Sequence, residues 1–142
     1  MIRSSMMNIE TRIDRVQGLR SHVLRGAGRF SDIKSYLEGL FLAAEFDPTI
    51  PAVWDVREAV FSDVTPSEVR DLACFLHQHW TAKYQRKMAV VASADFHFGL
   101  SRMLEQFTGP SAQGKFRTFR DLPPALEWIG GQATAAPHPA QE

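Results

Sequence analysis

Two short runs of apolar residues constrain the fold of this chain more than any other feature of its sequence. Residues 52–56 read Ala-Val-Trp-Asp-Val and residues 88–92 read Met-Ala-Val-Val-Ala, so neither run alternates regularly between apolar and polar side chains. Continuous apolar runs of this length are typical of strands that are covered on both faces. We therefore expect the two segments to lie side by side at the centre of a sheet that amphipathic helices shield.

Amphipathic helices are expected around these runs. Residues 31–46 give the clearest pattern, with Ser31 as a suitable N-cap and apolar side chains that recur every three or four positions. Thr65 and Glu68 form a capping box around Pro66, so a second helix is expected to start there and to run to about Tyr84. The remaining two helices are predicted over residues 95–107 and 121–129.

Alternating side chains near the start of the chain predict a β-hairpin. Apolar and polar residues alternate through residues 7–16 and again through residues 19–27, and Gly18 between them suits a tight turn. Gly26 and Gly28 are expected to end the second strand. With a last short strand at residues 115–119, the order is β-β-α-β-α-β-α-β-α. This order indicates an α/β fold with a mixed, mostly parallel sheet and an antiparallel edge strand.

The length and composition fit one domain that folds without a metal or a disulfide. We expect the domain to span residues 7–129 and the segments 1–6 and 130–142 to be flexible termini. The 16 basic and 16 acidic residues cancel, which argues against nucleic acid as a partner. No apolar run approaches the roughly 20 residues of a membrane span, and the first residues are too polar for a signal peptide. A cytoplasmic location is therefore expected, with the lone Cys74 buried and inert.

The succession of these elements resembles the STAS fold of anti-sigma-factor antagonists, and in particular the STAS-like bacterial proteins grouped with it. The features that carry the resemblance are the opening hairpin, residues 31–46 with the following Asp47-Pro48, and the segments 53–57, 87–93 and 119–129. The related CRAL-TRIO fold of lipid carriers needs a longer chain to build its lipid cavity. The resemblance implies a non-catalytic regulatory or binding module that acts through a protein partner, through self-association as a homodimer, or through a small ligand.

Phosphorylatable STAS antagonists carry an Asp-Ser-Ser-Gly-like segment at the start of the helix that follows the central strand. The matching stretch here runs from Asp63 to Glu68; Asp63 matches, whereas the serine pair and the glycine do not. The resemblance thus makes Thr65 the candidate hydroxyl for phosphorylation. A phosphate at a helix N-terminus meets favourable backbone amides, although Glu68 would oppose it.

Polar side chains near the carboxyl ends of the predicted strands form a candidate rim for a ligand or a partner. Ligands of open α/β sheets bind at this edge, and Asp55 and Arg57 are expected there, near the starts of the two following helices. In the alternative interpretation, Asp55 caps loop amides and pairs with Arg57 or another arginine, which is a structural role. The complete candidate rim comprises Asp55, Arg57, Asp63, Thr65, Ser93, Asp95, Phe96 and His97.

Two further functional hypotheses remain open from the residues alone. In the first, an exposed Phe96 or Phe98 lines an apolar groove with the helix after Ser31, and the protein carries a small molecule or a lipid. In the second, Asp55, Asp95 and His97 share a polar pocket and the protein is an enzyme, although no catalytic motif is present. The histidines and the cysteine lack ligand spacing, so neither a metal site nor a cofactor is expected.

Overall fold

The computed structural model describes residues 7–44, 46–47, 49–61, 63–82, 87–108 and 115–134, with the backbone alone described for residues 80–82 and 131–134. Five strands form one sheet in the order β1-β2-β3-β4-β5. The elements in chain order are β1 (Asn8–Asp14), β2 (Leu19–Gly28), α1 (Phe30–Leu42), β3 (Ala52–Phe61), α2 (Pro66–Ala82), β4 (Met88–Val91), α3 (Asp95–Thr108), β5 (Phe116–Phe119) and α4 (Leu122–Thr134).

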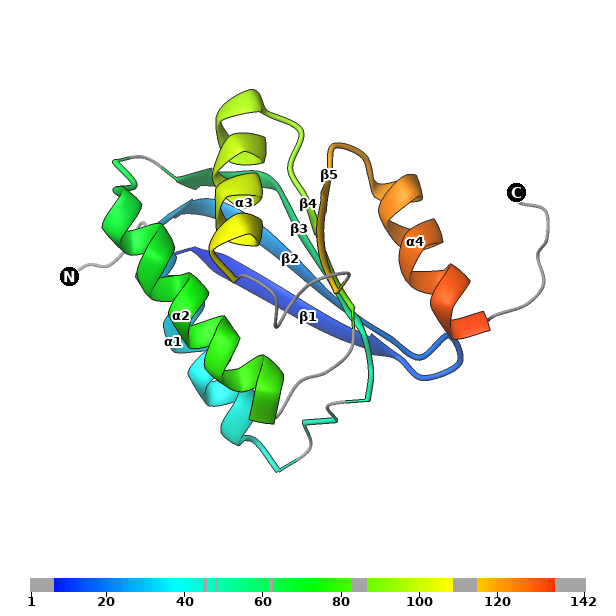
Figure 1. Ribbon diagram of the computed structural model, residues 1–142. Helices are drawn as coiled ribbons and strands as arrows, with labels where there is room; N and C mark the ends of the chain where they lie inside the picture. Colours follow the sequence, from blue (N-terminus) through cyan, green and yellow to red (C-terminus); the bar gives the residue numbers. More distant parts are fainter. Residues whose placement is uncertain are drawn as a thin grey trace.

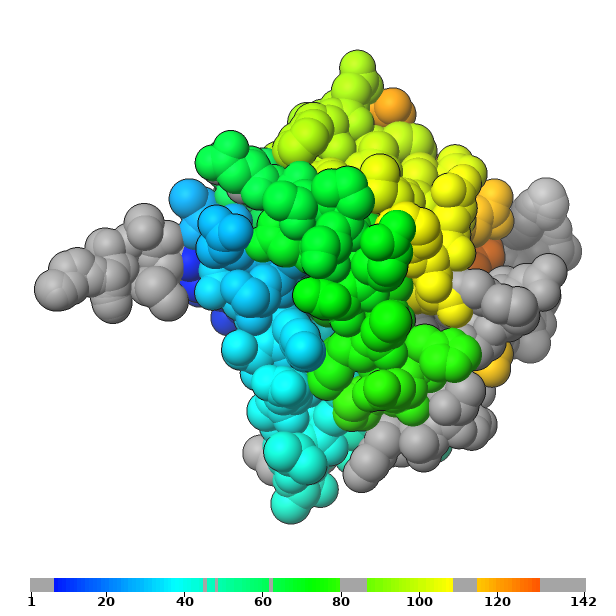
Figure 2. Space-filling model, turned by 60° about the vertical axis from the view of Figure 1, so that its left-hand side comes forward, coloured from blue at the N-terminus to red at the C-terminus, as the bar shows by residue number. Residues whose placement is uncertain are grey.

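The sheet is mixed. Strand β1 pairs antiparallel with β2, and the pairs β2–β3, β3–β4 and β4–β5 are parallel. Helices α1, α2 and α3 cover one face (Figure 1), where they lie side by side as one layer (Figure 2), and α4 covers part of the other face. The predicted element order, the mostly parallel sheet and the antiparallel edge strand are confirmed.

The central strands are buried on both faces, as the two apolar runs predict. Trp54 and Met88 face the layer of α1, α2 and α3, and belong to the larger core. Val53, Ala89 and Val91 face the opposite way and pack in a second core with Ala125 and Ile129 of α4. Because β3 and β4 pair directly in the middle of the sheet, the expectation that they form its shielded centre is confirmed.

Strand β3 is longer than the apolar run that predicts it, because it continues to Phe61. Ala59 and Phe61 are buried against the helical layer while Val60 between them is exposed, so the second half of the strand is covered on one face only. Its partner β2 also continues, and the two glycines expected to end it differ: Gly26 adopts a φ of 91° and still pairs with Ala59, whereas Gly28 is the last residue of the strand.

Several helix ends differ from those predicted. Helix α1 begins at Phe30, because the Asp32 carboxylate accepts a hydrogen bond from the Arg29 backbone N–H at 2.8 Å, so Ser31 lies inside the first turn and is not the N-cap. It ends at Leu42, before the predicted residue 46. Helix α4 continues to Thr134, beyond the predicted helix end at residue 129. The predicted end of α2 at Tyr84 lies outside the described residues.

Strand β2 of the hairpin turns its more polar row of side chains inward. Arg20, His22 and Leu24 of β2 are buried beneath the helical layer, whereas Ser21 and Val23 face the other side of the sheet. The Arg20 guanidinium is accommodated because it donates a hydrogen bond to the Asp47 carbonyl at 2.9 Å.

Among the described helices, none is long and apolar enough to cross a membrane.

A substitution at Leu24, which faces inward, tests this packing directly. We expect Leu24→Ala to lower the free energy of unfolding by about 2–5 kcal/mol, because it removes a fully buried side chain from the larger core. Leu42→Ala is the matched control: Leu42 is 81% exposed, so its loss should change stability by less than about 0.5 kcal/mol. Urea denaturation of both variants measures the difference, and equal effects would contradict the assignment of the buried face.

Candidate functional site

One helix covers only part of the second sheet face. Helix α4 packs on β3, β4 and β5, which leaves the outward side chains of β1, β2 and the near side of β3 uncovered. A groove of about 320 Å³ lies on this surface. We call it the open-face groove. Its main lining residues are Glu10, Arg12, Leu19, Ser21, Val23, Arg25, Val53 and Asp55 of the sheet and Leu122 and Leu126 of α4.

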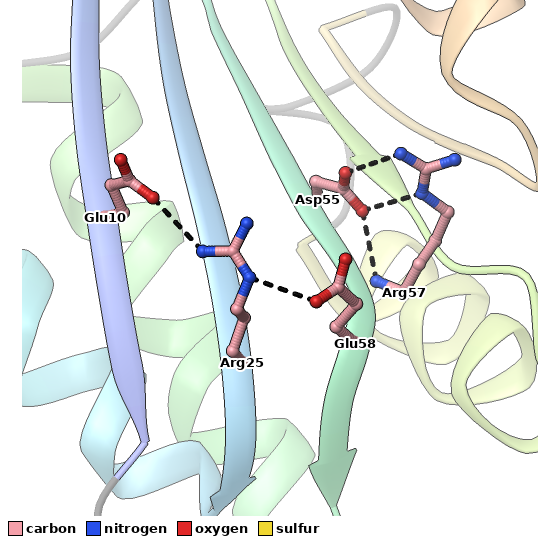
Figure 3. A network of polar contacts seen from close by, with 5 residues as sticks. All are labelled: Glu10, Arg25, Asp55, Arg57 and Glu58. Atoms are coloured by element: carbon pink, nitrogen blue, oxygen red, sulfur yellow. Dashed lines mark hydrogen bonds and ion pairs between the residues drawn. The ribbon is translucent and has the colours of Figure 1, made fainter.

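Arg25 is the centre of a charged network across three strands of this surface. Its Nη1 donates to Glu10 Oε1 on β1 at 3.1 Å, and its Nε donates to Glu58 Oε1 on β3 at 3.0 Å (Figure 3). The hydrogen bond from Arg25, with a second one from Arg12, lowers the pKa of Glu10. All these side chains are partly or largely exposed, so each pair adds little stability and mainly orients the charges.

Asp55 and Arg57 form a separate pair next to this network. Asp55 Oδ1 accepts hydrogen bonds from the Arg57 backbone N–H at 3.1 Å and from its Nε at 2.9 Å, and Oδ2 accepts one from Nη2 at 2.7 Å (Figure 3). Burial raises the pKa of Asp55, but the hydrogen bonds from Arg57 outweigh it and the net pKa is lowered. The carboxylate is therefore ionised and fully engaged, as the structural interpretation of Asp55 requires.

Asp55 and Arg57 do not lie at the carboxyl end of their strand, where they were expected, because β3 is longer than predicted. Asp55 and Arg57 lie in the middle of the strand, because β3 continues to Phe61. Asp55 is nevertheless level with the carboxyl end of the neighbouring strand, since it pairs with Val91, the last residue of β4. It thus reaches the expected level of the sheet, on the open face.

The remaining residues of the predicted rim divide into separate groups. Ser93 and Asp95 follow β4 and both contact Arg120: Ser93 Oγ donates to the Arg120 carbonyl at 2.9 Å, and Arg120 Nη1 donates to Asp95 Oδ1 at 2.8 Å. Arg120 also lies over the ring of Phe98 at 4.1 Å. Phe96 beside them is 54% exposed. These contacts join the ends of β4 and β5 and leave the Asp95 carboxylate at the surface.

Thr65 and Asp63 lie beyond the carboxyl end of β3. The predicted capping box is present, because Thr65 N–H donates to Glu68 Oε1 at 2.9 Å and Glu68 N–H donates to Thr65 Oγ1 at 3.2 Å. Glu68 also pairs with Arg29 at 2.9 Å. Asp63 adopts a φ of 58°, in the left-handed region, where the chain turns from β3 towards α2.

The structure does not bring together the three residues of the enzyme hypothesis. His97 lies on the helical side of the sheet, where its Nε2 accepts a hydrogen bond from the Phe61 backbone N–H at 3.2 Å. Asp55 projects from the open face, and Asp95 pairs with an arginine at the surface. Each of the three groups thus has a different partner, and the sheet separates Asp55 from His97.

An apolar cavity lies between the sheet and helices α1, α2 and α3, beside His97. Its volume is about 60 Å³, well below the roughly 300 Å³ at which pockets for drug-sized ligands begin. Phe98 packs against the larger core and Phe96 points to solvent, so they do not line a common groove.

Cys74, which was expected to be buried, is exposed on α2. Among the described residues, no group of His, Cys, Asp and Glu is arranged to hold a metal ion.

A buried polar cluster on the helical side of the hairpin was not predicted from the sequence. His22 Nδ1 is 2.9 Å from Thr11 Oγ1, which also bonds to the Tyr36 hydroxyl, and the His22 ring stacks on Trp54 with centroids 3.9 Å apart. Within the described part of the chain, neither His22 Nε2 nor Trp54 Nε1 has a hydrogen-bond partner. Burial, together with Arg20, lowers the pKa of His22 to about 3. The only signal for this cluster is that Thr11 and His22 face each other across the hairpin.

Comparisons with known proteins support the fold. No protein-family model matches the sequence, and no curated protein shows a significant match. Among solved structures, the chain is similar to an uncharacterised protein of the DUF3478 family with a SpoIIAA-like fold from Shewanella loihica, with 21% identity and a TM-score of 0.53 over 91% of this chain and 99% of that one. The chain therefore has a SpoIIAA-like fold, and the STAS-like fold expected from the sequence is confirmed.

The buried His22 predicts how stability depends on pH. Because the unfolded chain takes up a proton near pH 6.5 and the folded chain only near pH 3, stability is highest above pH 6.5 and falls as the pH decreases towards 3. The contribution lost between pH 7 and pH 5 is about 2 kcal/mol. Urea denaturation at several pH values should show this loss in the wild type and in His77→Gln, which alters an exposed histidine, but not in His22→Gln. The same pH dependence in His22→Gln would contradict the assignment.

Proposed function

We propose that this protein is a cytoplasmic, non-catalytic regulatory module of the STAS type that binds a partner protein through the open-face groove. The observation that carries the proposal is the half of the sheet that α4 leaves uncovered. A sheet face of a single domain is usually covered by its own helices or exposes a simple polar surface. Here a groove lined by apolar side chains lies beside the ion pairs of Arg25 and Arg57, and such a mixture of apolar and charged groups is the composition expected of a protein-binding surface.

The charges of the groove favour a protein over a nucleic acid as its partner. On this face Glu10 and Glu58 pair with Arg25 of the neighbouring strand, and Asp55 pairs with Arg57 of its own strand. This balanced pattern produces no extended positive surface for phosphates. It instead offers donors and acceptors at fixed positions, which select a partner with the complementary pattern.

The apolar part of the groove supplies the area that such a partner would bury. Val23 and Val53 line it, together with Leu126 of α4, which is exposed. The groove has a volume of about 320 Å³, whereas the apolar cavity beneath the helices holds only about 60 Å³. A protein segment therefore fits this surface better than a lipid fits the core, and a small polar ligand in the groove is the alternative occupant.

The geometry gives an enzyme less support than a binding module. Catalysis by Asp55, Asp95 and His97 requires them to meet around one reacting atom. Each is instead bonded to a partner of its own, on different sides of the sheet or at its edge. Groups that are paired in this way orient a surface and do not transfer protons to a common substrate.

Regulation through Thr65 is the second part of the proposal. The Thr65 hydroxyl is exposed at the N-terminus of α2, and its Oγ1 accepts the Glu68 N–H. A phosphate there would replace this cap, repel Glu68 and attract Arg29, which now pairs with Glu68 at 2.9 Å. Phosphorylation would thus exchange one partner of Arg29 for another and rearrange the start of α2 next to α1.

Site-specific crosslinking in the native host tests the binding surface. A photoreactive residue in place of Val23 should crosslink to one defined protein, because Val23 lines the groove. Arg25→Glu should lower the yield about tenfold, since it reverses the central charge of the surface. Arg102→Glu, on exposed α3 across the sheet, is the matched control and should have no effect. A yield that Arg25→Glu leaves unchanged would overturn the proposal, and a small-molecule adduct alone would favour the alternative occupant.

The role of Thr65 is tested by stability and by mass. Thr65→Ala should lower the free energy of unfolding by about 1 kcal/mol, because the N-cap of α2 is lost, while Thr65→Ser should retain it. In addition, intact-mass analysis of the protein from its native host should show a phosphorylated fraction that Thr65→Ser keeps and Thr65→Ala lacks. Protein that is always unmodified would remove the regulatory part of the proposal and leave the binding surface untouched.

A further inference from the structure

Strand β1 is an edge of the sheet whose outer side has no partner strand within the described residues. It pairs only with β2, over seven residues from Asn8 to Asp14. The opposite edge, β5, has four residues and is flanked by α3 and α4. Free edges of this length are sites at which another strand adds its own hydrogen bonds to the sheet. The longer and less covered edge of this protein is therefore β1.

The side chains of β1 differ on its two faces. Ile9, Thr11 and Ile13 pair with the inward-facing residues of β2 and lie on the helical side, whereas Glu10 and Arg12 lie on the open face. Ile13 is 41% exposed although it lies on the side of the core. An apolar side chain at the edge of the core, left half open, is the kind of surface that a neighbouring strand covers.

The sequence of β1 is complementary to itself when two copies run antiparallel. Two identical edges can pair in this way only about a two-fold axis perpendicular to the sheet, so side chains on the same face meet. With the axis at Thr11, Glu10 of each copy lies opposite Arg12 of the other, and Ile9 lies opposite Ile13. A shift of the axis by one residue in either direction puts Arg12 opposite Arg12, or Glu10 opposite Glu10, which is unfavourable.

We propose that the protein forms a symmetric dimer in which β1 pairs antiparallel with β1 of a second copy, centred on Thr11. The sheet then becomes continuous through ten strands, twice the five of one chain. Both helical layers lie on one side, and both open-face grooves lie on the other. Arg12, whose side chain is 79% exposed and, among the described residues, bonds only Glu10 of its own strand, has the freedom to turn to Glu10 of the second copy.

This inference does not depend on the partner proposed for the groove. The dimer uses the backbone edge of β1, whereas most side chains of the groove project from β2, β3 and α4. Glu10 and Arg12 of β1 take part in both surfaces, and Glu10 retains Arg25 as a partner on its own chain at 3.1 Å when Arg12 turns outward. A monomer with a functional groove, and a dimer without a groove partner, are distinguishable results.

Charge reversal separates this dimer from other modes of association. Native mass spectrometry and analytical ultracentrifugation should show a wild-type dimer at concentrations on the order of 100 µM, as expected for a small interface. Arg12→Glu alone and Glu10→Arg alone should each be monomeric, because like charges then meet twice. An equimolar mixture of the two variants should form a one-to-one heterodimer, because the charges become complementary again. Arg102→Glu on α3 is the control and should dimerise as the wild type does.

Hydrogen exchange of the wild type tests the same pairing without any substitution. The backbone amides of residues 8–14 should become better protected as the protein concentration rises, while amides of β5 should not change. A wild type that stays monomeric, an Arg12→Glu variant that dimerises like the wild type, or a mixture that forms no heterodimer although circular dichroism shows both variants folded would overturn the proposal.

Discussion

Burial of the β3–β4 pair on both faces is the constraint from which the rest of the architecture follows. Trp54 and Met88 need a cover on one side, and Val53, Ala89 and Val91 need one on the other. Each set can be removed from water only if helices pack on both faces, so the chain must alternate strands with crossover helices. The parallel pairing of β2 through β5 and the position of α4 both meet this requirement.

The cover on the second face is incomplete for a geometric reason. A helix with its side chains is about 10 Å wide and neighbouring strands are roughly 4.8 Å apart, so one helix shields two or three strands. Helix α4 is the only described element on that face, and it packs over β3, β4 and β5. The outward positions of β1 and β2 are therefore left to solvent or to a partner. Their polar side chains, such as Arg12 and Ser21, are consistent with that exposure.

The same strands carry polar side chains of two different kinds on the opposite faces of the sheet. On the open face, Arg25 and Arg57 hold carboxylates in exposed pairs, where solvent screens the charges and orientation is the main result. On the helical face, His22 is kept neutral by burial and stacks on Trp54. The first arrangement suits recognition at a surface. The second arrangement makes the hairpin part of the core and makes the stability of the protein depend on pH.

Local patterns in the sequence predict the order of the elements, the two buried strands, the Thr65–Glu68 capping box and the closeness of Asp55 to Arg57. All of these depend on residues near each other in the chain, where periodicity and spacing are direct signals. Three features became visible only in the folded protein: which row of the hairpin faces inward, how far β3 extends, and that Arg25 joins Glu10 to Glu58. These features depend on strand register and on which helix covers which face. They are set by contacts between distant segments, and local patterns carry no information about them.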